Sequence, residues 1–330
     1  FDSLFLTPQD EDFWVVTTAP ADYDNDGDLD IAVFGYYVVY NESAEHRLVL
    51  IRNDGPAGPE EWEFAYIDVY LDSLYAGASD MAWGDVDSDG DMDLVLGSYG
   101  ETVLFRNDNG NLALTSTELP GYYEDNLQAD FDLRSITWAD FDNDGDQDLL
   151  IPSVYDFEEY RFRTALMRND GDNGSGGIMF TETDSVFAAT AHAQSAWADY
   201  DNDQDLDLLL VNLVPNTDEG FIHRYTNEGN GIFTKDNVLD SINLDHGEIQ
   251  CGDYDADGDL DILVVGDVFG TFDQVLWIFE TTATGYDTLS IVSCSFCEGW
   301  LDLNAATWAD YDSDGDIDVL LAGSYVGENN

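Results

Sequence analysis

Short runs of aliphatic and aromatic residues alternate along the chain with clusters of Asp, Asn and Gly. Each run is too short for a helix, and the Asp and Gly residues that flank it are typical of turns. The pattern therefore predicts β-strands. Six such runs each follow an aspartate-rich loop: Ile31–Phe34, Leu94–Leu96, Leu149–Ile151, Leu208–Val211, Ile262–Val265 and Val319–Leu321. No stretch has the apolar period of a long amphipathic helix. The sequence therefore predicts an all-β protein.

The aspartate-rich loop is an internal repeat. Its first copy, residues 21–30, reads ADYDNDGDLD, and the later copies begin their acidic run at Asp85, Asp140, Asp199, Asp253 and Asp310. Successive copies are 54 to 63 residues apart, a period that suits a four-stranded β-propeller blade with its loops. We therefore expect residues 1–330 to form a single β-propeller domain with six calcium-loop blades.

Each loop is expected to join the first and second strands of a blade. A short stretch ending in a large residue, such as Ser195–Trp197, comes before the loop, and the apolar run comes after it. The third strand leads to a turn in which Asn, Asp and Gly supply the positive φ angles of a hairpin. These turns are Arg52–Gly55, Arg106–Asp108, Arg168–Gly171 and a degraded Thr226–Gly229, and fourth strands are expected at Ile178–Thr183 and Ile232–Lys235.

Tryptophan occupies one position of the repeat, two residues before the first loop aspartate. Trp83, Trp138, Trp197 and Trp308 stand there, whereas Pro20 and Cys251 fill the place in the other two repeats. We expect these rings to pack between neighbouring inner strands, with an aromatic ligand-binding box as the alternative.

The two ends of the sequence do not match. The sixth repeat has its loop and second strand and then stops at Asn330, so its blade is expected to be incomplete. Phe1–Leu6 resembles a fourth strand, either a closing strand or an exchanged outer strand. The chain is then part of a seven-bladed or tandem propeller, or another chain supplies the missing strand. An unpaired strand edge promotes association.

Carboxylates occupy positions 1, 3, 5 and 9 of the first loop, namely Asp22, Asp24, Asp26 and Asp30. Gly27 stands at position 6, where the chain must turn sharply, and position 7, Asp28, can offer its backbone carbonyl. Ca²⁺ accepts six to eight such oxygen ligands in loose geometry, whereas Mg²⁺ needs a tighter octahedron and Zn²⁺ prefers His or Cys. A solvated acidic turn is the alternative for one loop, but six copies in phase with the strands favour one Ca²⁺ per loop.

The other five loops have the same pattern. Their predicted ligands are Asp85, Asp87, Asp89 and Asp93; Asp140, Asp142, Asp144 and Asp148; Asp199, Asp201, Asp203 and Asp207; Asp253, Asp255, Asp257 and Asp261; and Asp310, Asp312, Asp314 and Asp318, with Asp91, Asp146, Asp205, Asp259 and Asp316 at position 7. In the fourth loop Gln204 replaces the glycine. A Gln at positive φ carries strain of about 1 kcal/mol or more, so we expect this site to be weaker or differently shaped.

Charge narrows the range of partners. The chain has 71 acidic and 9 basic residues, a net charge of −62, which disfavours nucleic acids and anionic lipids and favours divalent cations. A salt-rich habitat is another source of such charge. Without metal the loop carboxylates repel one another, so ion binding should contribute to folding stability. No apolar run is long enough for a membrane span.

The D-x-D-x-D-G-D-x-D loops and the R-N-D-G turns resemble the FG-GAP/VCBS repeats of integrin-α-type β-propellers, over almost the whole chain. In that family the loop joins the first and second strands of a blade. Its members are commonly extracellular and often seven-bladed, and they include adhesion receptors, lectins and some polysaccharide lyases. The resemblance implies the fold and an extracellular or cell-surface location, but not one activity.

Two functions follow as hypotheses. The first is an extracellular structural or adhesive module that binds another copy, a surface protein or a glycan, and assembles into a fibre or array through its incomplete blade. The second is a carbohydrate-binding propeller, or a polysaccharide lyase built on one. His192 and His246 each lie seven residues before their loop and are expected to occupy the same place in adjacent blades. Ordinary polar residues are the alternative there. No catalytic constellation is visible, so we expect no enzyme.

Cysteine and glycosylation signals are weak. Cys294 and Cys297 form a C-x-x-C pattern that suits a local disulfide or two free thiols. Asn41 and Asn173 begin sequons in predicted loops and permit glycosylation without establishing it.

Overall fold

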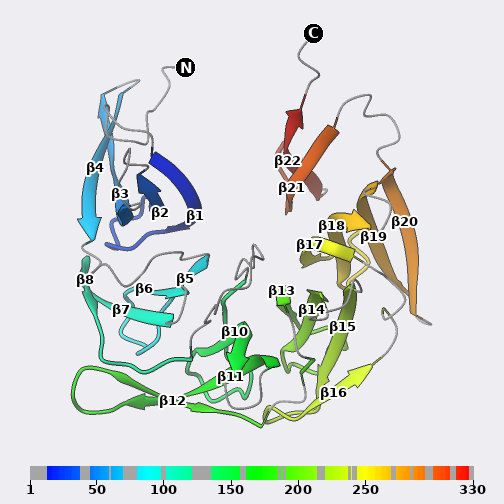
Figure 1. Ribbon diagram of the computed structural model, residues 1–330, viewed down its shortest axis with the longest axis horizontal. Helices are drawn as coiled ribbons and strands as arrows, with labels where there is room; N and C mark the ends of the chain where they lie inside the picture. The colour runs from blue at the N-terminus through cyan, green and yellow to red at the C-terminus, as the bar shows by residue number, and fades with distance from the viewer. Residues whose placement is uncertain are drawn as a thin grey trace. The chain divides into compact units, whose positions relative to one another are not determined.

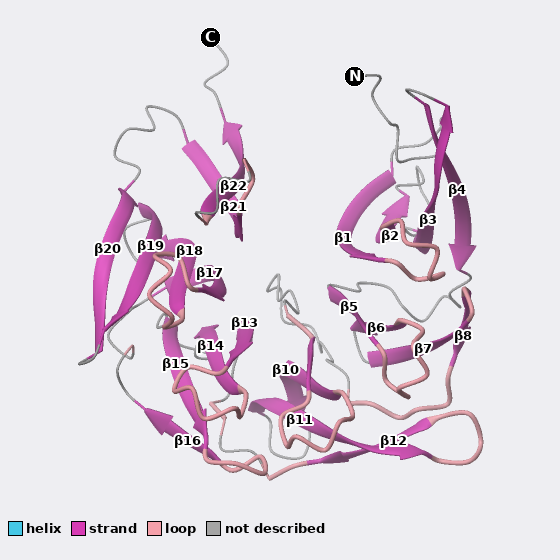
Figure 2. Ribbon diagram, turned by 180° about the vertical axis from the view of Figure 1, so that it is seen from behind, coloured by secondary structure: helices cyan, strands magenta, loops and turns pink. Residues whose placement is uncertain are grey.

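A computed structural model describes residues 13–37, 45–58, 61–69, 80–97, 102–120, 135–156, 161–184, 187–188, 191–213, 220–236, 239, 244–268, 273–282, 285–293, 300–312 and 317–326. All regular elements in these ranges are β-strands, which confirms the predicted all-β class (Figures 1 and 2). A search of the same ranges for an apolar helix long enough to span a membrane finds none.

The strands form successive antiparallel sheets in which strand order follows chain order (Figure 1). We number these sheets as blades. Blade 1 contains β1 (Phe13–Ala21), β2 (Asp30–Tyr37), β3 (Glu45–Gly58) and β4 (Glu61–Val69); blade 2 contains β5 (Asp80–Gly84), β6 (Asp93–Gly97), β7 (Thr102–Asp108) and β8 (Asn111–Leu114); blade 3 contains β9 (Thr137–Ala139), β10 (Asp148–Asp156), β11 (Arg161–Asp172) and β12 (Ile178–Glu182). Four strands in this order are the blade of a β-propeller.

The later blades repeat the arrangement. Blade 4 contains β13 (Ala191–Ala198), β14 (Asp207–Leu213), β15 (Gly220–Asn227) and β16 (Phe233–Asp236); blade 5 contains β17 (Leu244–Gly252), β18 (Asp261–Val268), β19 (Asp273–Thr282) and β20 (Gly285–Ser293); blade 6 contains β21 (Trp300–Ala309) and β22 (Asp318–Val326). Every aspartate loop joins the first and second strands of its blade, as the sequence predicts.

The chain divides into two compact units. The first contains residues 1–138, 145–161 and 165–183, and the second contains residues 139–144, 162–164 and 184–330. A single domain over residues 1–330 stays a prediction.

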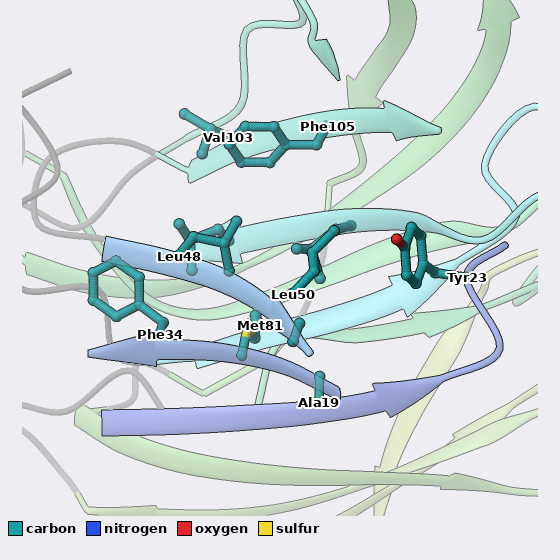
Figure 3. Close-up of a cluster of buried hydrophobic side chains, with 11 residues drawn as sticks. Ala19, Tyr23, Phe34, Leu48, Leu50, Met81, Val103 and Phe105 are labelled. Atoms are coloured by element: carbon teal, nitrogen blue, oxygen red, sulfur yellow. The ribbon is translucent and has the colours of Figure 1, made fainter. Parts of the chain in front are cut away.

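In the first unit, the second strand of blade 2 packs on both neighbouring blades. Phe34 of β2 belongs to a cluster with Leu94 and Leu96 of β6, and Figure 3 shows Phe34 in this cluster with Leu48 and other side chains. Val95 lies on the other side of β6 and packs with Leu149 of β10. Because side chains alternate across a strand and both faces are buried, the second strand reads as a continuous apolar run.

The second unit repeats this alternation. Leu209 of β14 packs in one cluster with Ile262 and Val264 of β18, and Leu263 on the opposite face of β18 packs with Val319 of β22. The side chain two positions after the loop's last aspartate therefore points to the following blade, whereas its neighbours point to the preceding blade.

Blade 6 has two strands among the described residues. Leu320 of β22 corresponds to Leu209 and Leu263 in the repeat, which are 0% and 1% exposed, but Leu320 itself is 63% exposed. The expected closing strand, Phe1–Leu6, lies outside the described residues.

Trp83 and Trp308 pack between inner strands, as predicted. Trp83 stacks on Tyr23 of the preceding loop with ring centroids 6.1 Å apart, and its Nε1–H donates to the Ala19 carbonyl at 3.0 Å. Trp308 stacks in the same way on Tyr254, at 6.0 Å. Where Cys251 replaces the tryptophan, its Sγ lies 2.8 Å from the Tyr200 hydroxyl. These side chains join consecutive blades.

Candidate metal centres in the aspartate loops

The position-1 and position-5 carboxylates organise the loop backbone. In the first loop, Asp22 accepts the backbone N–H of Asp26 at Oδ1 and that of Gly27 at Oδ2, both at 3.0 Å. Asp26 Oδ1 then accepts the N–H of Asp28 at 2.9 Å. The second loop makes the same three bonds. The bonds curl the loop so that its carboxylates converge.

Two backbone positions in the loop have positive φ. Position 6 is one of them, with Gly27 at +96° and Gln204 at +79°, which confirms the expected conformation of that glutamine. Position 4 is the other, and sequence reasoning missed it. Its residues are Asn25 (60°), Ser88 (58°), Asn143 (59°), Asn202 (60°) and Ala256 (58°). The preference of Asn for this conformation was the available signal.

The position-9 aspartate ties the loop to the third strand. Asp93 is fully buried, and its Oδ2 accepts the Val86 N–H at 2.9 Å while its Oδ1 accepts the Asn107 N–H at 2.7 Å. Asp207 makes the equivalent bonds with Tyr200 and Asn227. Position 9 therefore has a structural role besides the predicted ligand role.

Burial controls the ionisation of these carboxyls. The pKa of Asp93 is raised to about 7, mainly because burial desolvates the carboxylate; its two backbone N–H donors oppose the rise, and the nearby charges of Asp87 and Asp89 add to it. The pKa of Asp207 is raised to about 6 for the same main reason. A cation in the loop would reverse this effect, because it favours the charged form.

Carboxylate oxygens from different loop positions meet in clusters. In the first two loops positions 1, 3 and 9 contribute, and in the fourth loop positions 1, 3 and 5 contribute, with the oxygens of each set within 4.8 Å of one another. The sets are Asp22, Asp24 and Asp30; Asp85, Asp87 and Asp93; and Asp199, Asp201 and Asp203. A further set joins Asp89 and Asp91 to Asp108 at the end of β7.

The donor set fits a hard cation. Asp24 Oδ1 and Asp87 Oδ1, both at position 3, are buried and accept no hydrogen bond from any residue that the structure describes. A buried carboxylate oxygen without a donor is costly, and a metal ion would offset that cost. Arg106 forms an ion pair with Asp87, and Arg52 Nε lies 3.7 Å from Asp24 Oδ2. These two arginines thus compensate part of the charge of their own loops.

The asparagine of the R-N-D turn contacts the loop of the preceding blade. Asn107 Nδ2 donates to the Tyr23 carbonyl at 2.6 Å and to the Met92 carbonyl at 3.0 Å. Asn169 reaches Val86 in the same way. The asparagine that follows the arginine, Asn107 or Asn169, therefore connects two consecutive blades.

The segments predicted as turns lie in the third strands instead: Arg52–Gly55 is inside β3 and Arg168–Gly171 inside β11, each at a register shift, and Arg106–Asp108 ends β7. A residue of positive φ forms a bulge there without ending the strand. The expected positive φ falls on Gly55, Gly171 and Gly229, and in the second blade on Asn109 and Gly110.

The remaining predicted residues lie partly inside and partly outside the described residues. In the sixth loop Asp310, Asp312 and Asp318 are described, and Asp318 Oδ2 accepts the Tyr311 N–H at 3.3 Å. The other two aspartates of that loop, Asp314 and Asp316, lie outside the described residues, as do Asn41, Cys294 and Cys297. His192 and His246 lie in β13 and β17, but their side chains are not described. Asn173 is exposed between β11 and β12, so a glycan would have access to it.

Comparison with known proteins supports the repeat and the fold. Residues 85–151 and 199–264 match the family described as FG-GAP-like repeat. Compared with curated protein sequences, the chain matches none. Among solved structures, it is similar to a lectin of Agrocybe aegerita described in terms of specific recognition of non-reducing terminal N-acetylglucosamine. The TM-score is 0.58 at 16% identity, over 92% of this chain and 74% of the lectin chain. At this identity the likeness concerns the fold alone.

Proposed function

Because the chain is a protein of FG-GAP-like repeats with β-propeller blades, we propose that it is a calcium-stabilised structural or adhesive module outside the cell. In this proposal each loop binds one Ca²⁺, and the molecule associates with another copy through blade 6. The calcium part is supported most directly by the buried Asp24 Oδ1 and Asp87 Oδ1, which lie among converging carboxylates without a hydrogen-bond donor.

The predicted calcium ligands at loop positions 1, 3 and 7 would each offer a different kind of oxygen atom to the ion. Position 1 already accepts backbone N–H bonds, so it would bind the ion with a remaining lone pair. Position 3 has a buried oxygen available, and the position-7 backbone carbonyl lies in the same turn. Calcium would neutralise the mutual repulsion of these groups. Extracellular calcium modules bind with dissociation constants of about 10⁻⁴–10⁻³ M, so the proposal requires only moderate affinity at each loop.

An exposed apolar side chain of blade 6 supports association. Leu320 of β22 is 63% exposed, whereas the corresponding Leu209 of β14 is 0% exposed. Burying one leucine side chain contributes roughly 1.5–3 kcal/mol. A further β-sheet from a second copy would cover this face and would also pair the β22 edge.

Light scattering on the native chain tests the association. In calcium, the measured mass should increase with protein concentration, and Leu320→Glu should abolish the increase. Ile232→Glu is the matched control, because Ile232 is 64% exposed in the β15–β16 turn and belongs to no proposed interface. A strictly monomeric wild-type chain in calcium would contradict this part of the proposal and leave the calcium part standing.

Carbohydrate binding is the second candidate function, and one observation favours it. The similar solved structure belongs to a lectin, although the shared fold does not transfer a ligand. A glycan array that includes terminal N-acetylglucosamine, together with an assay for cleavage of acidic polysaccharides, separates a lectin from a lyase. Calcium-dependent binding without cleavage would support the lectin.

A further inference from the structure

Neighbouring aspartate loops are joined by a side-chain hydrogen bond in two places. Asn25 Nδ2 of the first loop donates to Asp91 Oδ1 of the second loop at 2.6 Å. Asn143 Nδ2 of the third loop donates to Asp205 Oδ1 of the fourth loop at 2.5 Å. In both cases the donor stands at position 4 of one loop and the acceptor at position 7 of the next, so the same bridge occurs twice.

Both residues of the first bridge, Asn25 and Asp91, belong to predicted calcium-binding loops. Asn25 lies between the predicted ligands Asp24 and Asp26 and has a φ of 60°. Asp91 is 8% exposed, and its backbone N–H donates to Asp89 Oδ1 at 3.0 Å. Its Oδ2 accepts the N–H of Asn109 at 2.7 Å. Asp91 therefore connects the first loop, its own loop and the β7–β8 turn.

The described residues of the second, fourth and fifth loops do not form this bridge as donors. Position 4 is Ser88 in the second loop and Ala256 in the fifth, and neither side chain carries an amide. Asn202 of the fourth loop has the same φ of 60° as Asn25, yet no hydrogen bond joins it to Asp259, although the structure describes both residues. The loops are therefore linked in pairs, the first with the second and the third with the fourth.

We infer that Asn25 and Asn143 are positioning residues that couple calcium binding within these two pairs of loops. The inference rests on the proposed calcium sites. An ion in the first loop fixes the backbone on both sides of Asn25 and so presents its amide to Asp91. The second loop is then partly ordered before its own ion binds, and the ion binds more tightly. Reciprocity requires the same effect in the opposite direction. We expect a roughly five- to tenfold change in affinity, at the lower end of typical couplings.

Hydrogen exchange, followed by mass spectrometry during a calcium titration, gives for each loop the calcium concentration at which its protection is half complete. We call this concentration the calcium midpoint of the loop. Asn25→Ser introduces the residue that stands naturally at position 4 of the second loop, at nearly the same φ. Asn202→Ser is the matched control, since Asn202 makes no bridge. Asn25→Ser should raise the calcium midpoint of residues 85–93 about five- to tenfold, and Asn202→Ser should leave the midpoint of residues 253–261 unchanged.

A double-mutant cycle removes local effects at Asn25. Disabling the second loop with Asp87→Ala should raise the midpoint of residues 22–30 in the wild-type background and have no such effect in the Asn25→Ser background. Equal effects in both backgrounds, or an unchanged midpoint for residues 85–93 in Asn25→Ser, would overturn the coupling while calcium binding stands. If calcium protects no loop at all, the proposed calcium sites fail, and the coupling fails with them.

Discussion

The side-chain amide of Asn107 in blade 2 lies 2.6 Å from the backbone carbonyl of Tyr23 in the loop of blade 1, to which it donates a hydrogen bond. The two residues are 84 positions apart in the sequence. Asn227 makes the same contact with the carbonyl of Phe141 at 2.7 Å. Each aspartate loop in these pairs is therefore held by its own blade and by the next one, so that metal binding and blade packing share the same backbone.

Asn107→Ala should destabilise the calcium-loaded protein by about 1–3 kcal/mol, because it leaves the carbonyls of Tyr23 and Met92 without their buried donor. Urea unfolding in excess calcium measures the loss. Asn111→Ala is the control, since Asn111 is exposed at the start of β8 and its replacement should change stability by less than about 0.5 kcal/mol. Equal losses for the two variants would show that the bridge contributes nothing.

The calcium-free protein should lose stability as the pH rises. Burial raises the pKa of Asp93 from 3.8 to about 7 in the folded chain, so the folded state binds the proton more tightly than the unfolded state. The resulting stabilisation is fully present below the unfolded pKa and is lost as the pH passes through about 7. Thermal unfolding in metal-free buffers from about pH 5 to 8 should therefore show a falling Tm.

Saturating calcium should weaken or reverse this trend, because the ion favours the charged carboxylate. Asp93→Asn should flatten the metal-free profile, since the amide does not titrate. A metal-free Tm that rises steadily with pH would contradict the proposed ionisation of the buried position-9 aspartates.

Gln204→Gly should stabilise the protein by about 0.5–1 kcal/mol, since Gln204 has a φ of 79° that glycine adopts without strain. The reverse change is available in the second loop, where Gly90 has a φ of 93° and no atom lies within 4 Å of the place where a Cβ would stand. Gly90→Gln should therefore be destabilising through backbone strain alone. Chemical denaturation in calcium compares the two variants, and opposite signs are expected.

The sequence was sufficient for the features that repeat locally. The run Leu94–Leu96 was predicted as a second strand, and it is the centre of β6. The strand order of the blades and the packing role of Trp83 were also predicted correctly. These features depend on side-chain alternation, on turn residues and on a fixed period, all of which are visible in one repeat.

The features that join repeats could not be predicted in this way. The sequence predicted Asn107 only as a turn residue. Its hydrogen bond to Tyr23 was missed because the two residues lie far apart in the sequence. The bridge from Asn25 to Asp91 was missed for the same reason, although the Asn at position 4 was a signal for positive φ. The hydrogen bonds of Asp93 were also missed, because its burial follows from the packing of the third strand over the loop.

Calcium removal tests the central claim most directly. Each site saturated at about 100 times its Kd contributes about 2.7 kcal/mol to folding, so the Tm of the chelated chain should fall sharply and return when Ca²⁺ is restored, with about one ion per loop counted by native mass spectrometry. An unchanged Tm after exhaustive chelation, with no ion bound in excess calcium, would contradict the account.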